Sequence, residues 1–199
     1  SNTFSLGVKL LNNTELKFGS VLVDVGFEKV SMGLFKNLAL VHSATLPIGV
    51  NHIAKDISKV CSLSLDESRI IRDNIDFSFQ DNSNLFDGND YLKSIYFINS
   101  NFRKISKNLI LNVTKARLDE ILEILKKQLI VPGFNLNSGI NFLLTGEGSN
   151  LLNLEKYCEN FFRLSTKKIS QNNIENENDF EKNFASSLGA LKIIKDGWE

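Results

Sequence analysis

The first quarter of the chain alternates between short aliphatic runs and polar breaks, a pattern typical of β-strands. Three runs are rich in β-branched and aliphatic residues: Ser20–Val25, Val30–Phe35 and Ala39–Leu46. The dipeptide Lys36-Asn37 joins the second run to the third and suits a tight hairpin turn. Residues 1–15 carry a weaker helical pattern. The sequence therefore predicts three antiparallel strands after a helical start.

Helical periodicity replaces this alternation after Pro47. An amphipathic helix is expected up to about Cys61, because apolar residues recur at helical spacing: Val50, Ile53, Ile57 and Val60. A short helix follows, since Ser64 and Glu67 have the spacing of a capping box. Residues 73–92 are rich in Asn, Asp and Ser, and we expect them to be irregular or hairpin-like.

The third quarter is predicted to hold two short strands and then a long helical stretch. Ser94–Ile98 and Phe102–Ile105 are the expected strands. Apolar residues at helical spacing continue from Lys107 to Ile130, a length that suggests two consecutive helices. Pro132 and Gly133 end this stretch.

The last quarter begins with a continuously apolar run, Gly139–Thr145, as expected for a central strand covered on both faces. The turn Gly146-Glu147-Gly148-Ser149 leads from it into a helix. A short strand at Thr166–Ile169, a polar loop at residues 170–179 and a final helix at residues 180–195 follow. This order predicts an α/β fold with a mixed five-stranded sheet, flanking helices and a small inserted α+β subdomain.

The charge balance and the cysteine content limit the classes of partner and the redox chemistry to be expected. The 199 residues carry 23 basic and 23 acidic side chains, so the net charge is zero. A balanced charge gives no electrostatic basis for binding nucleic acid or an anionic membrane surface. Cys61 and Cys158 lie far apart without a CxxC spacing, and we expect buried, reduced thiols.

No catalytic residue and no metal site are predicted. Asp24, at the end of the first strand, has the position of one carboxylate in a ribonuclease H-like nuclease. A two-metal site needs several converging carboxylates, however, and the strand at residues 139–145 carries none. His42 and His52 have no Cys or acid at ligand spacing, so we expect them to be structural.

An ordered series of motifs links the chain to a known family. The series is Val23-Asp24-Val25-Gly26; Leu40, His42, Leu46, Pro47, Gly49, His52, Ile53, Asp56 and Ile57; Arg117, Glu120 and Ile121; Leu144-Thr145-Gly146-Glu147-Gly148-Ser149 with Leu151; and Ala185 with Gly189. It resembles the second half of the actin-like ATPases, and in particular the FtsA family of bacterial cell-division proteins. The resemblance covers nearly the whole chain and implies an actin-like ATPase (ribonuclease H-like) fold.

The resemblance also implies two subdomains. Residues 1–47 and 119–199 would form the ribonuclease H-type core, called 2A, and residues 48–118 the inserted subdomain 2B. The family's first half and its C-terminal membrane-binding helix would lie outside this sequence. We therefore expect a piece of a longer protein that associates with itself and works on the cytoplasmic face of the inner membrane at the division site.

In actin-like ATPases an adenine nucleotide with Mg²⁺ binds between the two halves. The resemblance implies these nucleotide-binding residues: Asp24, Gly26, Arg72, Gly146, Gly148 and Ser149. Glycines normally let the backbone approach the phosphates, but Phe27, Glu28 and Lys29 follow Gly26 here.

A ring and a negative charge at these positions predict weak or lost phosphate binding, and Lys29 would offset only part of the charge of Glu28. A purely structural turn at residues 146–149 and a solvated helix end at Arg72 remain the alternatives to nucleotide contacts there.

The family tethers the tubulin-like protein FtsZ to the membrane, and the C-terminal peptide of FtsZ docks on subdomain 2B. The resemblance places Lys115, Arg117 and Glu120 on that docking surface, where a basic side chain would meet an acidic tail. A solvated helix face with local ion pairs explains the same residues equally well. Both interpretations stay open from the sequence.

Two functions from different classes follow. The first is a non-catalytic or weakly nucleotide-binding adaptor of the division ring. The second is an active actin-family ATPase, such as a relative of the pilus-assembly ATPases, with a variant nucleotide loop.

Overall fold

The structure is a computed structural model of the 199-residue chain, and it describes residues 2–97, 104–134, 139–169 and 184–196. Its α-helices are α1 Asn2–Leu10, α2 Asn13–Phe18, α3 Val50–Cys61, α4 Leu65–Asn74, α5 Lys107–Gln128, α6 Leu154–Phe162 and α8 Ala185–Asp196. Its strands are β1 Ser20–Val25, β2 Val30–Lys36, β3 Ala39–Leu46, β4 Asn141–Thr145 and β5 Thr166–Lys168. Two short 3₁₀ helices are η1 Ser94–Tyr96 and η2 Glu147–Asn150.

The five strands form one mixed sheet in the order β3-β2-β1-β4-β5, which confirms the predicted architecture. The first three strands pair antiparallel, whereas β4 pairs parallel to both β1 and β5. The apolar strand β4 is therefore an interior strand with a neighbour on each side, and only Asn141 in it is not buried. The register aligns Asp24 with Thr145, so β1 and β4 end side by side.

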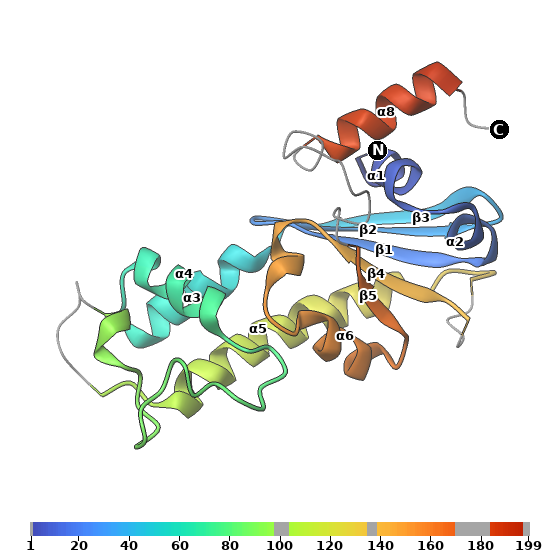
Figure 1. Cartoon of the computed structure of the whole chain (residues 1–199). Coiled ribbons are helices and arrows are strands. Elements are labelled where there is room, and N and C mark those ends of the chain that lie inside the picture. Colours follow the sequence, from blue (N-terminus) through green and yellow to red (C-terminus); the bar gives the residue numbers. More distant parts are fainter. Residues whose placement is uncertain (1, 98–103, 135–138, 170–183, 197–199) are drawn as a thin grey trace.

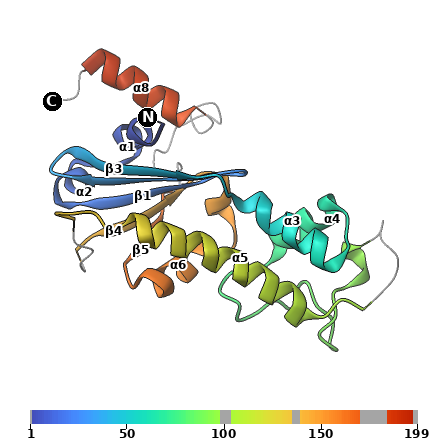
Figure 2. The same ribbon diagram turned by 180° about the vertical axis from the view of Figure 1, so that it is seen from behind.

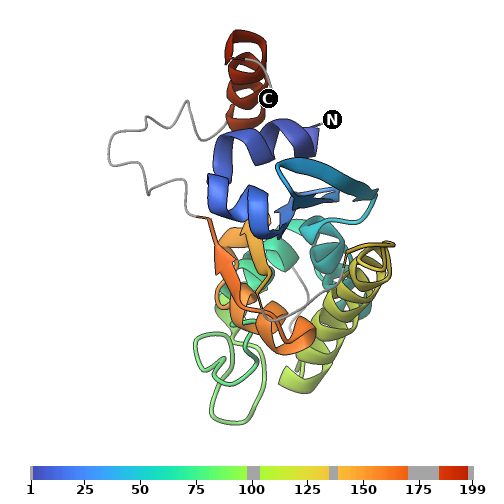
Figure 3. The ribbon, with the colours of Figure 1, turned by 90° about the vertical axis from the view of Figure 1, so that its right-hand side faces the viewer.

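Helices cover both faces of the sheet (Figures 1 and 3). On one face, α1 and α2 pack on the sheet and α8 lies over α1. Gly189 makes this close packing of α8 possible, because a Cβ there would overlap the carbonyl group of Ser5. On the other face lie α6 and the C-terminal half of α5.

The insert lies beyond one end of the sheet, where α3, α4 and the N-terminal half of α5 gather (Figures 1 and 2). Of the segment predicted to be irregular, residues 73–92, the first two residues still belong to α4, and residues 75–92 are irregular with an isolated bridge between Phe86 and Leu92. The capping box of α4 is also confirmed, since the Ser64 hydroxyl accepts from the Glu67 N–H and the Glu67 carboxylate accepts from the Ser64 N–H.

Two predictions for residues 94–130 are wrong. Ser94–Tyr96 form a 3₁₀ helix, and Lys104–Ile105 are not a strand, while residues 98–103 lie outside the described part. The stretch from Lys107 is a single 22-residue helix, not two. It stays continuous because its buried positions keep helical spacing throughout, at Ile110, Thr114, Leu118, Ile121, Leu122 and Leu125.

Element boundaries differ in smaller ways. The hairpin turn is Asn37-Leu38, both with positive φ, because Lys36 still belongs to β2. Glu147–Asn150 form a 3₁₀ turn, and α6 starts only at Leu154, so the glycine turn is not the N-terminus of an α-helix. The expected polar loop at residues 170–179 lies outside the described residues.

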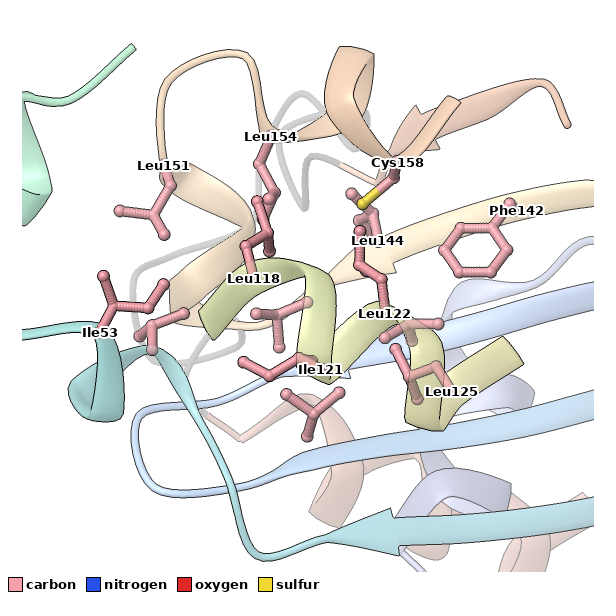
Figure 4. Close-up of a pocket in the computed structure, with 14 residues that line it drawn as sticks. Ile53, Leu118, Ile121, Leu122, Leu125, Phe142, Leu144, Leu151, Leu154 and Cys158 are labelled. Carbon is pink, nitrogen blue, oxygen red and sulfur yellow. The ribbon is translucent and has the colours of Figure 1, made fainter. Parts of the chain in front are cut away.

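A dry cavity of about 20 Å³ lies between the sheet, α5 and α6 (Figure 4). Its lining is wholly apolar and includes Leu118, Ile121, Phe142, Leu144 and Cys158. Water needs polar partners as well as room, so this space does not hold one. The cavity belongs to the core. Cys158 there is buried, as is Cys61, and both positions agree with the prediction of buried cysteines; burial raises the pKa of Cys158 to about 12.

Candidate nucleotide loop and partner groove

The ends of β1 and β4 bring most of the family-derived nucleotide residues together. Gly146 has φ +85°, and a Cβ there would overlap Asp24 Oδ1 and lie 2.8 Å from the Val25 carbonyl oxygen. The Gly148 position is as tight, since a Cβ would lie 2.6 Å from side-chain atoms of Val25 and Val50. The Ser149 hydroxyl donates to the Gly146 carbonyl at 2.6 Å, which fixes the turn. Glycine is therefore required at both positions by the packing of the two loops.

Asp24 is a half-buried carboxyl group at the centre of this arrangement. Burial raises its pKa above the ordinary 3.8, and the nearby Lys29 ammonium lowers it in part. Within the described parts of the chain, no donor hydrogen-bonds the carboxylate. Few favourable contacts thus offset the cost of burying the negative charge of Asp24. This is typical of a residue that serves a functional site and does not contribute to stability.

We expect Asp24→Asn to stabilise the full-length, ligand-free protein. An acid whose pKa is raised by folding destabilises the native state once pH exceeds that pKa. Partial solvent screening limits the gain at pH 7 to about 1 kcal/mol, or roughly 2–4 °C in Tm. Thermal unfolding followed by circular dichroism measures it. The gain should shrink as pH falls through the raised pKa, because the wild-type carboxyl is then protonated, and a gain independent of pH would contradict this cause.

The loop at residues 26–29 is tied to the first turn of α3. The Gly26 N–H donates to the Lys29 carbonyl at 3.0 Å, which closes the loop. The carbonyls of Gly26 and Phe27 then accept from the N–H groups of Val50 and Asn51, at 3.1 and 2.9 Å. These N–H groups have no acceptor within the helix, so the loop serves as the cap of α3.

The side chains of the loop also point to the insert. Glu28 accepts from the Asn51 amide at 2.6 Å and from Lys55 Nζ at 3.0 and 3.2 Å. The Arg69 guanidinium of α4 lies over the Phe27 ring, 5.4 Å from its centroid. Hydrogen bonds from Lys55 and Asn51 lower the pKa of Glu28. Lys55, not the adjacent Lys29, is therefore the cation that pairs with this carboxylate.

Arg72 lies apart from these loops on α4, and the interpretation as a solvated helix end is wrong. It is only 5% exposed. Its Nε and Nη2 atoms pair with Asp73, while Nη1 is buried and has no partner among the described residues. The structure does not bring Arg72 into contact with Asp24 or the glycine turn.

The predicted partner-binding residues of α5 lie on two flanks. Arg117 faces α3, where Nε and Nη2 donate to the two carboxylate oxygens of Asp56 at 2.5 and 3.1 Å, and Nη1 pairs with Glu120. These carboxylates raise the pKa of Arg117, chiefly through the Asp56 hydrogen bond. Lys115 is exposed and lies about 200° around the helix from Arg117, so it belongs to the opposite flank.

An open groove runs between α3 and α5 beside this ion pair. Its lining residues are Asp56, Lys59, Val60, Val113, Ala116, Arg117 and Glu120. Val60 is 49% exposed, and within the described residues no ion pair to Lys59 is present. The groove thus combines an apolar floor with a charged rim, which suits an amphipathic segment. Lys115 is not part of it.

Sequence reasoning missed the residues that hold the loop, namely Asn51, Lys55 and Arg69. Asn51 is only 2% exposed, which is unusual for an amide side chain and signals a specific partner. Their positions relative to Glu28 depend on how the insert folds back, and no spacing in the sequence reveals that. The expected structural role fits His52, whose Nδ1 accepts from the Gly49 N–H at 3.1 Å.

Comparison with known proteins identifies the family of this chain. The family profile described as "Cell division protein FtsA" matches residues 21–189, which is most of the chain. The chain belongs to the FtsA family. It is 27% identical over 141 residues to FtsA of Bacillus subtilis, covering 70% of this chain and 31% of that protein. It is 26% identical over 161 residues to FtsA of Neisseria meningitidis serogroup B, covering 79% and 38%. The FtsA-family chain thus spans about a third of the length of these curated relatives.

Solved structures confirm the actin-like fold. MreB5 of Spiroplasma citri bound to ADP has a TM-score of 0.64 at 18% identity, covering 98% of this chain and 59% of that one. A PilM–PilN type IV pilus biogenesis complex has a TM-score of 0.63 at 16% identity, covering 98% and 51%. Among the described residues of this FtsA-family chain, no helix is both long and apolar enough to cross a bilayer.

Proposed function

We propose that this FtsA-family chain is part of a cell-division adaptor that tethers FtsZ filaments to the cytoplasmic membrane and binds ATP weakly or not at all. The adaptor role rests on family membership, together with the groove between α3 and α5. The weak nucleotide binding rests on the loop at residues 26–29. Membrane contact is assigned to a segment outside this sequence.

The observation that carries the nucleotide part of the proposal is the chemistry of the loop. A phosphate site needs backbone N–H groups that can be approached closely and a surrounding positive potential. Here the positions after Gly26 carry an aromatic ring and a carboxylate, and Glu28 is ionised at neutral pH because its pKa is lowered. Two of the loop carbonyls face α3. These residues do not fit a triphosphate with Mg²⁺.

Isothermal titration of ATP-Mg²⁺ into the full-length protein tests this part. We expect no binding at micromolar concentration and no hydrolysis above background. Tight binding accompanied by turnover would instead support the second candidate, an active actin-family ATPase with a variant loop. One observation favours that candidate: Gly146, Gly148 and Ser149 keep a closely packed turn beside Asp24.

The groove between α3 and α5 is the proposed docking site for the C-terminal peptide of FtsZ. Its exposed Val60 can receive an apolar side chain, and Lys59 supplies a cation for an acidic tail. Asp56 and Glu120 already neutralise the charge of Arg117. We therefore give Arg117 two roles: it forms part of the groove rim, and its ion pair with Asp56 holds α3 against α5.

Arg117→Glu is expected to weaken binding of the FtsZ peptide about tenfold or more, because it reverses a rim charge and leaves Asp56 facing a second acid. Fluorescence anisotropy with a labelled peptide from the same organism measures the affinity. Asp56→Asn breaks the same ion pair but keeps the arginine. If its affinity stays near that of the wild type, Arg117 acts by contacting the peptide; if it falls as in Arg117→Glu, Arg117 acts by positioning α3. Lys127→Glu, an exposed charge reversal farther along α5, is the matched control.

Two results would contradict this placement. An unchanged affinity in Arg117→Glu would exclude the groove as the docking site. A loss of affinity in Lys115→Glu alone would move the peptide to the opposite flank of α5. Circular dichroism of each variant shows whether the fold is retained.

A further inference from the structure

In the loop at residues 26–29, the side chains of Phe27 and Glu28 each have a partner in the insert. Phe27 lies under Arg69 of α4. Glu28 is bound by Asn51 and Lys55 of α3. Glu28 is itself exposed, so the contact is marked as specific by the paired geometry and by the buried Asn51 amide turned toward the carboxylate, not by burial of Glu28.

Asn51 connects the two contacts into one network. Its Nδ2 donates to Glu28 at 2.6 Å, and its Oδ1 accepts from Arg69 Nε at 3.3 Å. The side chain is 2% exposed, so both of its polar ends need partners. We call Phe27, Glu28, Asn51, Lys55 and Arg69 the loop clamp.

The carboxylate of Glu28 lies beside the cationic and amide side chains of the start of α3, while the loop carbonyls occupy the first N–H groups of that helix. Asn51, His52 and Lys55 belong to the first two turns of α3, and the N-terminal end of a helix attracts negative charge. His52 Nδ1 lies 3.8 Å from Glu28 Oε2, and Lys55 Nζ lies 3.0 Å from it. The cation and the amide donor are thus already paired with a carboxylate of the same chain.

We propose that Glu28 is a built-in anion that takes the place of a bound phosphate and holds the insert on the core without a ligand. This inference rests on the proposed function, because it explains how the fold keeps its arrangement when nucleotide binding is weak. Phe27 completes the clamp by stacking under Arg69. The clamp therefore excludes a phosphate group from the start of α3 and removes the need for one.

Glu28→Gln in the full-length protein tests the clamp. Glutamine keeps the size of the side chain and removes its charge, and Glu28 is exposed enough that folding is not at risk. We expect inorganic phosphate, and ATP-Mg²⁺ as the second probe, to bind about tenfold or more tightly to the variant than to the wild type. Isothermal titration or the rise of Tm with probe concentration measures the change.

Hydrogen exchange of the backbone amides reports on the clamp even when no ligand is present. The N–H groups of Val50 and Asn51 donate to the loop carbonyls. We expect these amides to exchange faster in Glu28→Gln and to regain protection when phosphate is added. In the wild type, phosphate should leave their exchange unchanged.

Glu147→Gln is the matched control, because Glu147 is an exposed acid on the neighbouring glycine turn and is not part of the clamp. If phosphate affinity rose equally in this control, the gain in Glu28→Gln would come from the loss of any nearby negative charge and not from opening the clamp, which would overturn the proposal. Unchanged amide exchange and unchanged anion affinity in Glu28→Gln would also overturn it. Tight ATP binding by the wild type would instead overturn the proposed function, so the two failures are distinguishable.

Discussion

Gly49→Ala is expected to destabilise the protein by about 2–3 kcal/mol, a large effect for the addition of one methyl group. A Cβ at this position would lie 2.6 Å or less from three backbone atoms of the loop: the carbonyl oxygens of Gly26 and Phe27 and the nitrogen of Lys29. Backbone atoms cannot move away as a flexible side chain can. The loop must separate from α3, which breaks the bonds to Val50 and Asn51 as well.

Urea unfolding of the full-length protein measures this change, with Gly88→Ala as the matched control. A Cβ at Gly88 meets nothing within 4 Å, so we expect its stability to stay within about 0.5 kcal/mol of the wild type. Gly49 has ordinary extended dihedral angles, φ −126° and ψ −173°, so the cost of a Cβ there comes from the overlap and not from backbone strain. Equal stability of the two variants would show that the loop does not pack on α3 as described.

Phe142→Ala is expected to cost about 3–5 kcal/mol, the largest effect of a single side chain that we predict. Phe142 lies on the interior strand β4, is fully buried and stacks on Phe162 with 4.5 Å between ring centroids. It also lines the small apolar cavity, which its removal would enlarge (Figure 4). The enlarged space is lined only by apolar groups, so water cannot compensate for the lost contacts.

Phe18→Ala is the control for this prediction, because Phe18 is 69% exposed and its truncation should change the free energy of unfolding by less than about 0.5 kcal/mol. Phe142→Leu should lose less than Phe142→Ala, since leucine refills part of the volume. Equilibrium unfolding in urea gives all three values. A Phe142→Ala variant as stable as the wild type would contradict the burial of β4 beneath α5 and α6.

Much of the fold could be predicted from local patterns. The strands at residues 20–46 and 139–145 could be predicted because their aliphatic and β-branched runs favour strands without help from distant contacts. The start of α4 could be predicted because Ser64 and Glu67 have the spacing of a capping box. The strand predicted at Ser94–Ile98 failed because this segment is a 3₁₀ helix inside an irregular insert, where Phe97 is buried without strand pairing, whereas only Lys104 and Ile105 of the strand predicted at Phe102–Ile105 are described. Periodicity alone does not distinguish these cases.

The candidate site was predictable only where it depends on sequence motifs. Asp24 and the glycine turn meet because the carboxyl ends of parallel neighbours share one edge of the sheet. The partners of Glu28 and Arg117 were not predictable, because Asn51, Lys55 and Asp56 come from a helix whose orientation is set by tertiary packing. Lys115 and Arg117 were grouped by proximity in sequence, whereas positions two apart on a helix point in nearly opposite directions.

The continuity of α5 has a mechanical consequence. The helix is 22 residues long, and the boundary expected between residues 118 and 119 falls inside it. At 1.5 Å per residue it is a rod of about 33 Å, with one end beneath the sheet and the other within the insert. A tilt of about 5° at the core end would displace the far end by about 3 Å, so a small rearrangement below β4 would be enlarged at the insert.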